Sequence, residues 1–372
     1  MKGSRGSIVQ KGANYYAVIA IGPRRKWFKG GATKKAAQNV LNEKLGEIAT
    51  DTYKEIPNVK FAVFARQWLK NNKPNLKAST LELYEIIIEK HLILYWPECK
   101  LGSIRLPMIQ DYISARANQV GAKTIRNEVA VIKSIFKYAI EADYLKTNPS
   151  SHVKKPRVEK NQIDLLEPAE IKLLIANAPE AYRTAFMTAA YTGLRAGELW
   201  GLQWGDVDWN SGQIHIRRSL WKGQFQTPKS KSSIRQVDIP AFLISELKKW
   251  KIRCPINKDD LVFPNTDGES SNHYTVFKNH FQPALRRAGL RHVSFHSLRH
   301  SNASMRIQYG QNIKYLSTQL GHASIDITMD RYGHLFSDKD FIRGQVELMD
   351  ASVRKPLETD KKEGSEAIAV NA

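Results

Sequence analysis

The chain has 372 residues, 42% of them hydrophobic, which is long enough for two or three domains with buried cores. Its formal net charge of +21 and pI near 9.8 indicate a polyanionic partner; nucleic acid is favoured over a membrane, because no apolar run could span a bilayer. The basic N-terminus lacks the apolar stretch of a signal peptide, and Cys99 and Cys254 alone make no disulfide framework. We therefore expect a protein of the reducing cytoplasm.

Residues 1–50 have the pattern of a small sheet followed by a helix. Short alternating runs between glycines predict about three antiparallel strands, and 32–48 has the pattern of a helix capped by Thr33. The third strand carries three consecutive cations beside a tryptophan, which makes it a candidate DNA-binding surface; an edge strand guarded by charge is the alternative. These cations are Arg24, Arg25 and Lys26.

Residues 59–145 show apolar spacings of three and four, which predicts an all-helical domain. The expected helices span 61–71, 79–92, 106–117 and 122–144. Basic residues on these helices are candidates for phosphate contacts, which give affinity but little sequence information; ordinary solvated faces are the alternative. The candidates in the last helix are Lys123, Arg126 and Lys133. A basic stretch rich in proline, 146–166, is predicted to be an interdomain linker.

Residues 167–351 mix helices with a few strands, so the fold class is mainly α with small β elements. The predicted helices are 169–178, 180–191, a short one opened by Arg195, 240–253, 274–288, 297–309 and 311–320, the last closed by Gly321. The predicted strands are 212–218, 223–227 and 234–239, expected as one three-stranded sheet. Lys229 and Lys231 fall at the tip of a predicted hairpin, where a lysine can enter a DNA groove or be merely exposed. The tail 352–372 is expected to be disordered.

Chemistry-bearing side chains concentrate in 294–336. His296 and Arg299 lie one helical turn apart near a helix N-terminus, which suits a phosphate, and His322 follows a glycine cap. His296 and His300 have zinc-like spacing, but the glutamate of that metalloprotease motif is absent, so no metal is expected. Taken singly, Tyr332 fits a core residue and His322 a capping residue; the grouping favours catalysis.

Together these residues suit chemistry at a phosphodiester. Two arginines can bind its non-bridging oxygens, histidines and a lysine can move protons, and a tyrosine can attack phosphorus. No P-loop and no acidic cluster for two metals is present, so we expect no cofactor.

The motifs TGLRAGEL, HSLRH, LGHASI and DRYGHLF, with a basic hairpin between the first two, resemble the tyrosine recombinase family, and in particular phage-type integrases with an N-terminal arm-binding domain. The resemblance implies roles for six residues. Arg195 and Arg299 would bind the phosphate, His296 and His322 would support it, Tyr332 would be the nucleophile, and Lys231, or else Lys229, would protonate the leaving 5′ oxygen. His300 and His334 lie outside the matched positions and are expected to be structural. Tyr309 and Tyr315 precede His322, where the pattern has no nucleophile.

The implied reaction is conservative site-specific recombination that integrates or excises a mobile element such as a prophage. The resemblance also implies that the protein acts in the cytoplasm of a bacterial host, associated with the nucleoid. A homotetramer on double-stranded attachment-site DNA would act through a covalent 3′-phosphotyrosine and a Holliday junction. A C-terminal helix, 341–353, would dock on a neighbouring protomer. The resemblance leaves open a host DNA-bending protein and an excision factor as accessory partners. The rival hypotheses are a type IB topoisomerase and a catalytically silent DNA-binding regulator on the same fold.

Overall fold

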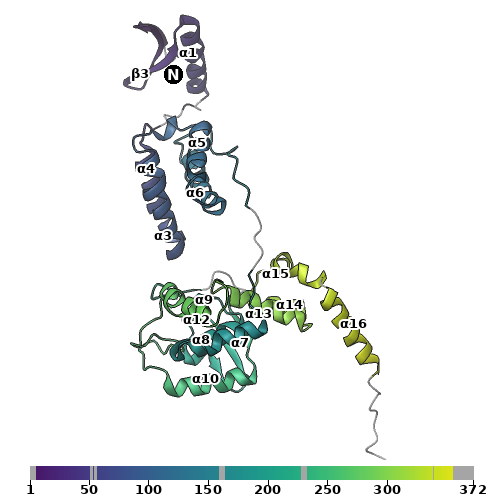
Figure 1. The fold of residues 1–372 in the computed structure, drawn as a ribbon. Coiled ribbons are helices and arrows are strands. Elements are labelled where there is room, and N and C mark those ends of the chain that lie inside the picture. The colour runs from purple at the N-terminus through teal and green to yellow at the C-terminus, as the bar shows by residue number, and fades with distance from the viewer. Residues whose placement is uncertain are drawn as a thin grey trace, which may run out of the picture. The chain divides into compact units, whose positions relative to one another are not determined.

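The computed structural model describes residues 6–50, 53, 57–158, 164–227, 233–337 and 339–354. Of residues 334, 337, 339, 340, 351, 352 and 354 it describes the backbone alone. The chain divides into two compact units, Met1–Lys160 and Asn161–Ala372 (Figure 1). Each unit is described by itself.

The first unit begins with the predicted sheet and helix. Strands β1 (Gly6–Lys11), β2 (Asn14–Ile21) and β3 (Arg24–Gly31) are antiparallel in the order β1-β2-β3. Helix α1 (Lys34–Ala49) starts at the predicted cap, because Thr33 Oγ1 accepts a hydrogen bond from the Ala36 amide at 3.2 Å. One face of the sheet packs on α1 through a small apolar cluster.

Helices make up the rest of the first unit. They are α2 (Phe61–Asn72), α3 (Ala78–Ile86), a π-helical segment (Ile87–Leu92), α4 (Ile93–Tyr95), α5 (Leu106–Ala117) and α6 (Ala122–Glu141). The prediction that α6 runs to residue 144 is wrong, because Asp143 takes a positive φ of 60° that ends the helix. Glu128 is fully buried between α5 and α6, where Tyr112 donates to it at 2.6 Å and Arg116 pairs with it.

The second unit is built around one large apolar core that includes Phe186, Trp200 and Phe281. Its first helices are α7 (Pro168–Ala176), α8 (Glu180–Thr192), α9 (Ala196–Trp200) and α10 (Ala241–Arg253). The predicted helix 274–288 is divided into α11 (His273–Val276), a π-helical segment (Phe277–Phe281) and α12 (Gln282–Arg287).

The described strands of the second unit form two sheets. A three-stranded sheet is present as expected, but its order is β4 (Val207–Asp208), β5 (Gln213–Ile216), β8 (Arg235–Asp238). Strands β6 (Ser219–Trp221) and β7 (Gln224–Gln226) pair only with each other among the described strands. The predicted hairpin is therefore wrong: the lysine-rich segment connects β7 of one sheet to β8 of the other.

The C-terminal part is a series of helices, drawn in green to yellow in Figure 1. They are α13 (Ser297–Gln308), α14 (Ile313–Leu320), α15 (Ile325–Tyr332), a 3-10 helix (Gly333–Ser337) and α16 (Lys339–Arg354). The predicted tail 352–372 starts too early, because α16 continues to Arg354; residues 355–372 lie outside the described part. Within the described ranges, no helix is both long and apolar enough to cross a membrane.

Candidate active site

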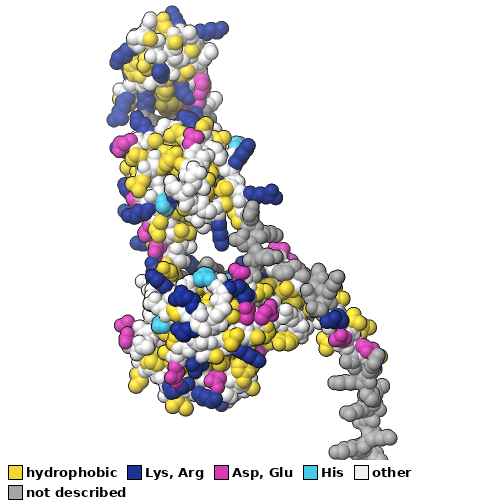
Figure 2. Space-filling view, viewed as in Figure 1, with side chains coloured by type: hydrophobic (Ala, Val, Ile, Leu, Met, Phe, Trp, Pro, Cys, Tyr) yellow, Lys and Arg dark blue, Asp and Glu magenta, His cyan; other side chains and the backbone are white. Residues whose placement is uncertain are grey.

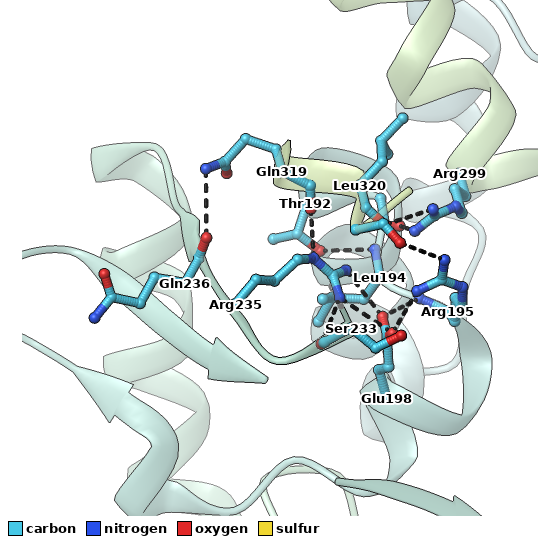
Figure 3. A network of polar contacts seen from close by, with 12 residues as sticks. Thr192, Leu194, Arg195, Glu198, Ser233, Arg235, Gln236, Arg299, Gln319 and Leu320 are labelled. Carbon is cyan, nitrogen blue, oxygen red and sulfur yellow. Dashed lines mark hydrogen bonds and ion pairs between the residues drawn. The ribbon is translucent and has the colours of Figure 1, made fainter. Parts of the chain in front are cut away.

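The C-terminal end of α14 is bound by three arginines from three other elements (Figure 3). Arg235 Nε donates to the carbonyl of Gln319 at 2.6 Å, and Arg299 Nη2 donates to the carbonyl of Leu320 at 2.6 Å. Arg195 Nη2 donates to the carbonyl of Gly321 at 2.9 Å. The last carbonyls of a helix lack partners within the helix and carry its negative dipole end, so they attract cations. This helix end therefore brings three guanidinium groups together.

The turn after α14 places His322 beside these arginines. Gly321 ends the helix with a left-handed φ of 65°, as the sequence predicts. A Cβ atom there would lie 2.9 Å from Arg235 Nη1, so only glycine allows the arginine this close to the turn. His322 follows at once, and its Nδ1 lies 2.7 Å from the hydroxyl of the buried Thr328.

Arg195 is the N-cap residue of α9. Its backbone N–H donates to Glu198 Oε2 at 2.9 Å and its Nη1 donates to Oε1 at 2.8 Å, so the same carboxylate orients its backbone and its side chain. Its side chain is 37% exposed. Within the described residues, this guanidinium uses two of its five N–H groups, which leaves donors for an incoming anion.

Arg235 and Glu198 form a buried ion pair beneath Arg195. The two nitrogen–oxygen contacts are 3.1 and 3.0 Å long, and both side chains are nearly inaccessible to solvent. Burial raises the pKa of Glu198, but Arg235 and then Arg195 outweigh that effect and lower it to about 2. Glu198 is therefore ionised, and one carboxylate compensates only part of the charge of three arginines.

Arg299 lies below the surface, only 3% exposed. Its Nη1 donates to the carbonyl of Gly193 at 2.8 Å, which fixes it to the turn that precedes Arg195. Burial and the neighbouring Arg195 lower its pKa to about 9, so it remains charged at neutral pH. A Cβ at Gly193 would lie 2.8 Å from Asn302 Oδ1, and its φ of 67° also favours glycine. Contacts of Gly193 with Arg299 and Asn302 therefore hold the turn of the TGLR motif against the helix of the HSLRH motif.

The histidines of the site are held in their neutral form. Burial, followed by His300 and Arg299, lowers the pKa of His296 to about 4. Burial, followed by Arg299 and Arg195, lowers the pKa of His322 to about 3. The positive charge of the site therefore comes from its arginines, and the neutral imidazoles each offer one donor and one acceptor.

Tyr332 is the last residue of α15 and is 1% exposed. Its ring lies in an apolar cluster with Ile307, Leu316 and Leu320, as expected of a core residue. Its hydroxyl is not left unpaired, because His300 Nδ1 lies 2.5 Å away. Burial raises the pKa of Tyr332 to about 12, although Arg299 and Arg331 act in the opposite direction.

The structure does not place every predicted residue. Lys229 and Lys231 lie outside the described residues. The rival tyrosines lie in other settings: Tyr315 donates its hydroxyl to Asp238 at 2.5 Å, and Tyr309 is 74% exposed. Among the described residues, no group of three or more His, Cys, Asp or Glu is arranged to hold a metal ion.

The predicted cations on β3 do not share one surface. Alternation along the strand puts Arg24 and Lys26 on the face that packs on α1, and Arg25 on the open face beside Trp27 and Lys29. On α6, spacings of three, seven and four place four cations along one stripe. They are Lys123, Arg126, Lys133 and Lys137. Lys and Arg side chains are also scattered over the visible surface of both units (Figure 2).

Two residues of the site, Glu198 and Arg235, were not singled out from the sequence, and a third, His300, was expected only to be structural. Glu198 stands at the third helical position after Arg195, where a capping carboxylate is common, so this signal was available. Arg235 has an inward position on a strand, which for a charged residue requires a buried partner. His300 carries no local signal of its contact, because Tyr332 is 32 residues further along the chain.

Two family models match this chain. One is described as the phage integrase family and covers residues 164–339; the other, its N-terminal SAM-like domain, covers residues 60–115. The chain belongs to the phage integrase family of tyrosine recombinases. In this integrase-family chain, the five described residues to which the sequence resemblance gives catalytic roles all lie within the matched range 164–339: Arg195, His296, Arg299, His322 and Tyr332.

Relatives extend the similarity over most of its length. The ICEBs1 integrase of Bacillus subtilis (strain 168) is 27% identical over 325 residues, covering 83% of this chain and 88% of that protein. The protein "Tyrosine recombinase XerC-like" of Caldanaerobacter subterraneus subsp. tengcongensis (strain DSM 15242 / JCM 11007 / NBRC 100824 / MB4) is 29% identical over 374 residues, covering 88% of this chain and 94% of that protein. The fold is also similar to that of a lambda integrase tetramer bound to a Holliday junction, with a TM-score of 0.60 and 20% identity, covering 85% of this chain and 96% of that one.

Proposed function

We propose that this chain is a site-specific recombinase that integrates or excises a mobile DNA element. Three arginines gathered at the end of α14, with the Tyr332 hydroxyl held at 2.5 Å by the same helix that carries Arg299, are the observation that carries the proposal. A phosphodiester carries the negative charge that such a cluster attracts, and guanidinium donors match its non-bridging oxygens.

Each residue has a distinct role in this proposal. Arg195 and Arg299 bind the scissile phosphate and stabilise the charge of its pentavalent transition state, with neutral His296 and His322 as supporting hydrogen-bond partners. Tyr332 attacks phosphorus, forms a 3′-phosphotyrosine and releases a 5′ hydroxyl. The linkage conserves the energy of the broken bond, so religation needs neither ATP nor a metal.

The general acid on the leaving oxygen is the proposed role of Lys231. The carbonyl of Ser233 accepts a hydrogen bond from Arg235 Nη1 at 3.2 Å. The chain that follows Lys231 is therefore in contact with the arginine cluster. Lys231 lies two positions before Ser233 in the sequence and Lys229 lies four positions before it, which favours Lys231.

The proposed partners are double-stranded attachment sites and three further copies of the chain. Residues 1–50 would bind arm sites, 59–145 would clamp the crossover site, 146–166 would link the two parts of the clamp, and 167–351 would perform the chemistry. The assembled form that passes through a Holliday junction would be a homotetramer, as in the solved lambda integrase complex. Helix α16 carries exposed apolar residues that would dock on a neighbouring copy, among them Ile342 and Val346.

Covalent trapping tests the proposal. The chain is mixed with DNA spanning the ends of its own element, nicked near the crossover so that the released fragment diffuses away. The expected product is an SDS-stable adduct in which Tyr332 holds a 3′ phosphate, formed without metal or ATP and absent from Tyr332→Phe. No adduct despite a footprint on the same DNA would favour a silent regulator. Supercoil relaxation without strand exchange would favour a topoisomerase.

A further inference from the structure

The sequence pattern assigns no role to His300, yet this residue touches the proposed reacting atom. Its Nδ1 lies 2.5 Å from the Tyr332 hydroxyl oxygen, at the short end of hydrogen-bond distances. A general base must lie within hydrogen-bond reach of the proton that it removes. Within the described residues, this is the hydrogen bond that the structure gives to the Tyr332 hydroxyl.

We infer that His300 accepts the hydroxyl proton of Tyr332 during attack on the phosphate, which makes it a further catalytic residue. This inference rests on the proposed function, because it takes Tyr332 as the nucleophile. The Tyr332 O–H bond breaks and its proton passes to Nδ1 while the phenolic oxygen bonds to phosphorus. The bond from phosphorus to the 5′ oxygen breaks, and that oxygen takes a proton from the general acid, Lys231. Religation returns both protons.

The position of His300 in α13 supports this role. It is adjacent to Arg299, so one rigid helix carries both the phosphate-binding guanidinium and the proton acceptor. The ring of His296 meets the ring of His300 edge to face at 4.7 Å between centroids, which restrains its orientation. The ring centroids of His300 and Tyr332 are 5.8 Å apart. Nδ1 is therefore aimed at the hydroxyl by contacts on both sides.

Electrostatics keep the acceptor available. Burial, then Arg331 and Arg299, lowers the pKa of His300 to about 4, so the imidazole is neutral at neutral pH and its Nδ1 lone pair can accept a proton. The groups that face it are His296 and Arg299 on its own helix and Arg331 and Tyr332 on α15. An anionic phosphodiester would offset the two arginines and so raise the proton affinity of His300 when DNA is bound.

The test uses the full chain and the nicked duplex, and measures the rate of adduct formation in a single turnover. His300→Asn retains a hydrogen-bond acceptor near the Nδ1 position but cannot take up a proton. Its rate should fall by about 10²- to 10³-fold at pH 7. The rate should then rise about tenfold per pH unit from pH 7 to 9, because solvent must deprotonate the phenol, while the unsubstituted chain is nearly flat over this range. His292→Asn, an exposed histidine elsewhere in the unit, is the matched control with an unchanged rate.

A second substrate separates proton removal from other roles. When sulfur replaces the bridging 5′ oxygen, the leaving group no longer needs a proton, so Lys231→Ala should recover its rate while His300→Asn should not. Three results would each overturn the inference. The first is rescue of His300→Asn by the sulfur-containing substrate. The others, on the ordinary substrate, are a His300→Asn rate equal to that of the unsubstituted chain and a rate lowered equally at every pH. An adduct of the unsubstituted chain on a residue other than Tyr332 would instead overturn the proposed nucleophile, and this inference with it.

Discussion

Arg235 and Glu198 meet through two hydrogen-bonded contacts of 3.1 and 3.0 Å in the interior of the catalytic unit. Neither residue is part of the matched catalytic pattern. Glu198 also holds the backbone and side chain of Arg195, while Arg235 holds the carbonyl of Gln319. The pair therefore connects α9, which follows Arg195, with the C-terminal end of α14, which precedes His322, and it sets the distance between two elements of the phosphate site.

Breaking this pair should destabilise the protein and disturb Arg195. Arg235→Met leaves Glu198 buried without its main partner, and losing one member of a buried ion pair costs about 3–5 kcal/mol. We expect a clearly lower midpoint of urea unfolding for Arg235→Met and for Glu198→Gln, with slower cleavage in both. The double variant should lose less than the sum of the two single losses. Additive losses would show that the two side chains act independently.

Arg195 and Arg299 should differ in what their loss does to stability. In Arg299→Lys, a single ammonium group replaces the two guanidinium nitrogens that donate to the carbonyls of Gly193 and Leu320. Both the cleavage rate and the free energy of unfolding should therefore fall. Arg195→Lys affects a side chain that is 37% exposed, so stability should change little. Cleavage should drop by about 10²- to 10³-fold in each, as when a transition-state donor is removed. Lost DNA binding with normal cleavage per bound complex would contradict this role.

The sequence predicted the elements of the site better than its internal contacts. Helices α13 and α14, the glycine cap at Gly321 and the cap at Thr33 follow from local signals, and all were predicted. The strand pairing was not, because β6 and β7 are short and their register depends on contacts across the unit. The same limit applies to the contact between His300 and Tyr332. The sequence fits Tyr332 to a core position and His300 to a structural one, but only the folded chain brings the two side chains together.

Two partly buried, neutral histidines predict acid-sensitive folding. His300 and His322 have pKa values of about 4 and 3, against about 6.5 for histidine in an unfolded chain. Between pH 6.5 and 4 the unfolded chain therefore binds more protons, so these residues add stability at neutral pH that is lost as the pH falls. The melting temperature should decrease over this range, and less steeply in His322→Asn. Identical pH slopes for the two proteins would contradict the lowered pKa of His322.

The open face of the N-terminal sheet should bind arm-site DNA. Arg25 and Lys29 flank Trp27, which is 52% exposed, whereas Lys26 lies on the face toward α1 with its ammonium 5.9 Å from the centre of the Tyr53 ring. Arg25→Ala and Lys29→Ala should each weaken binding and reduce the slope of log affinity against log salt by about 0.9. Lys26→Ala is the matched control with a smaller effect. Equal effects of all three variants would contradict a binding surface confined to the open face.

The apolar stripe of α16 should be needed for strand exchange and not for cleavage. Ile342, Val346, Met349 and Val353 recur at spacings of four, three and four and are 51%, 63%, 72% and 76% exposed, which is typical of a helix face that binds a partner. Val346→Asp should abolish tetramer formation on a Holliday junction while leaving adduct formation on a nicked half-site within a few fold. Glu347→Gln, on another face of the same helix, should recombine normally. Normal recombination by Val346→Asp, measured between two intact sites, would remove α16 from the proposed interface between copies.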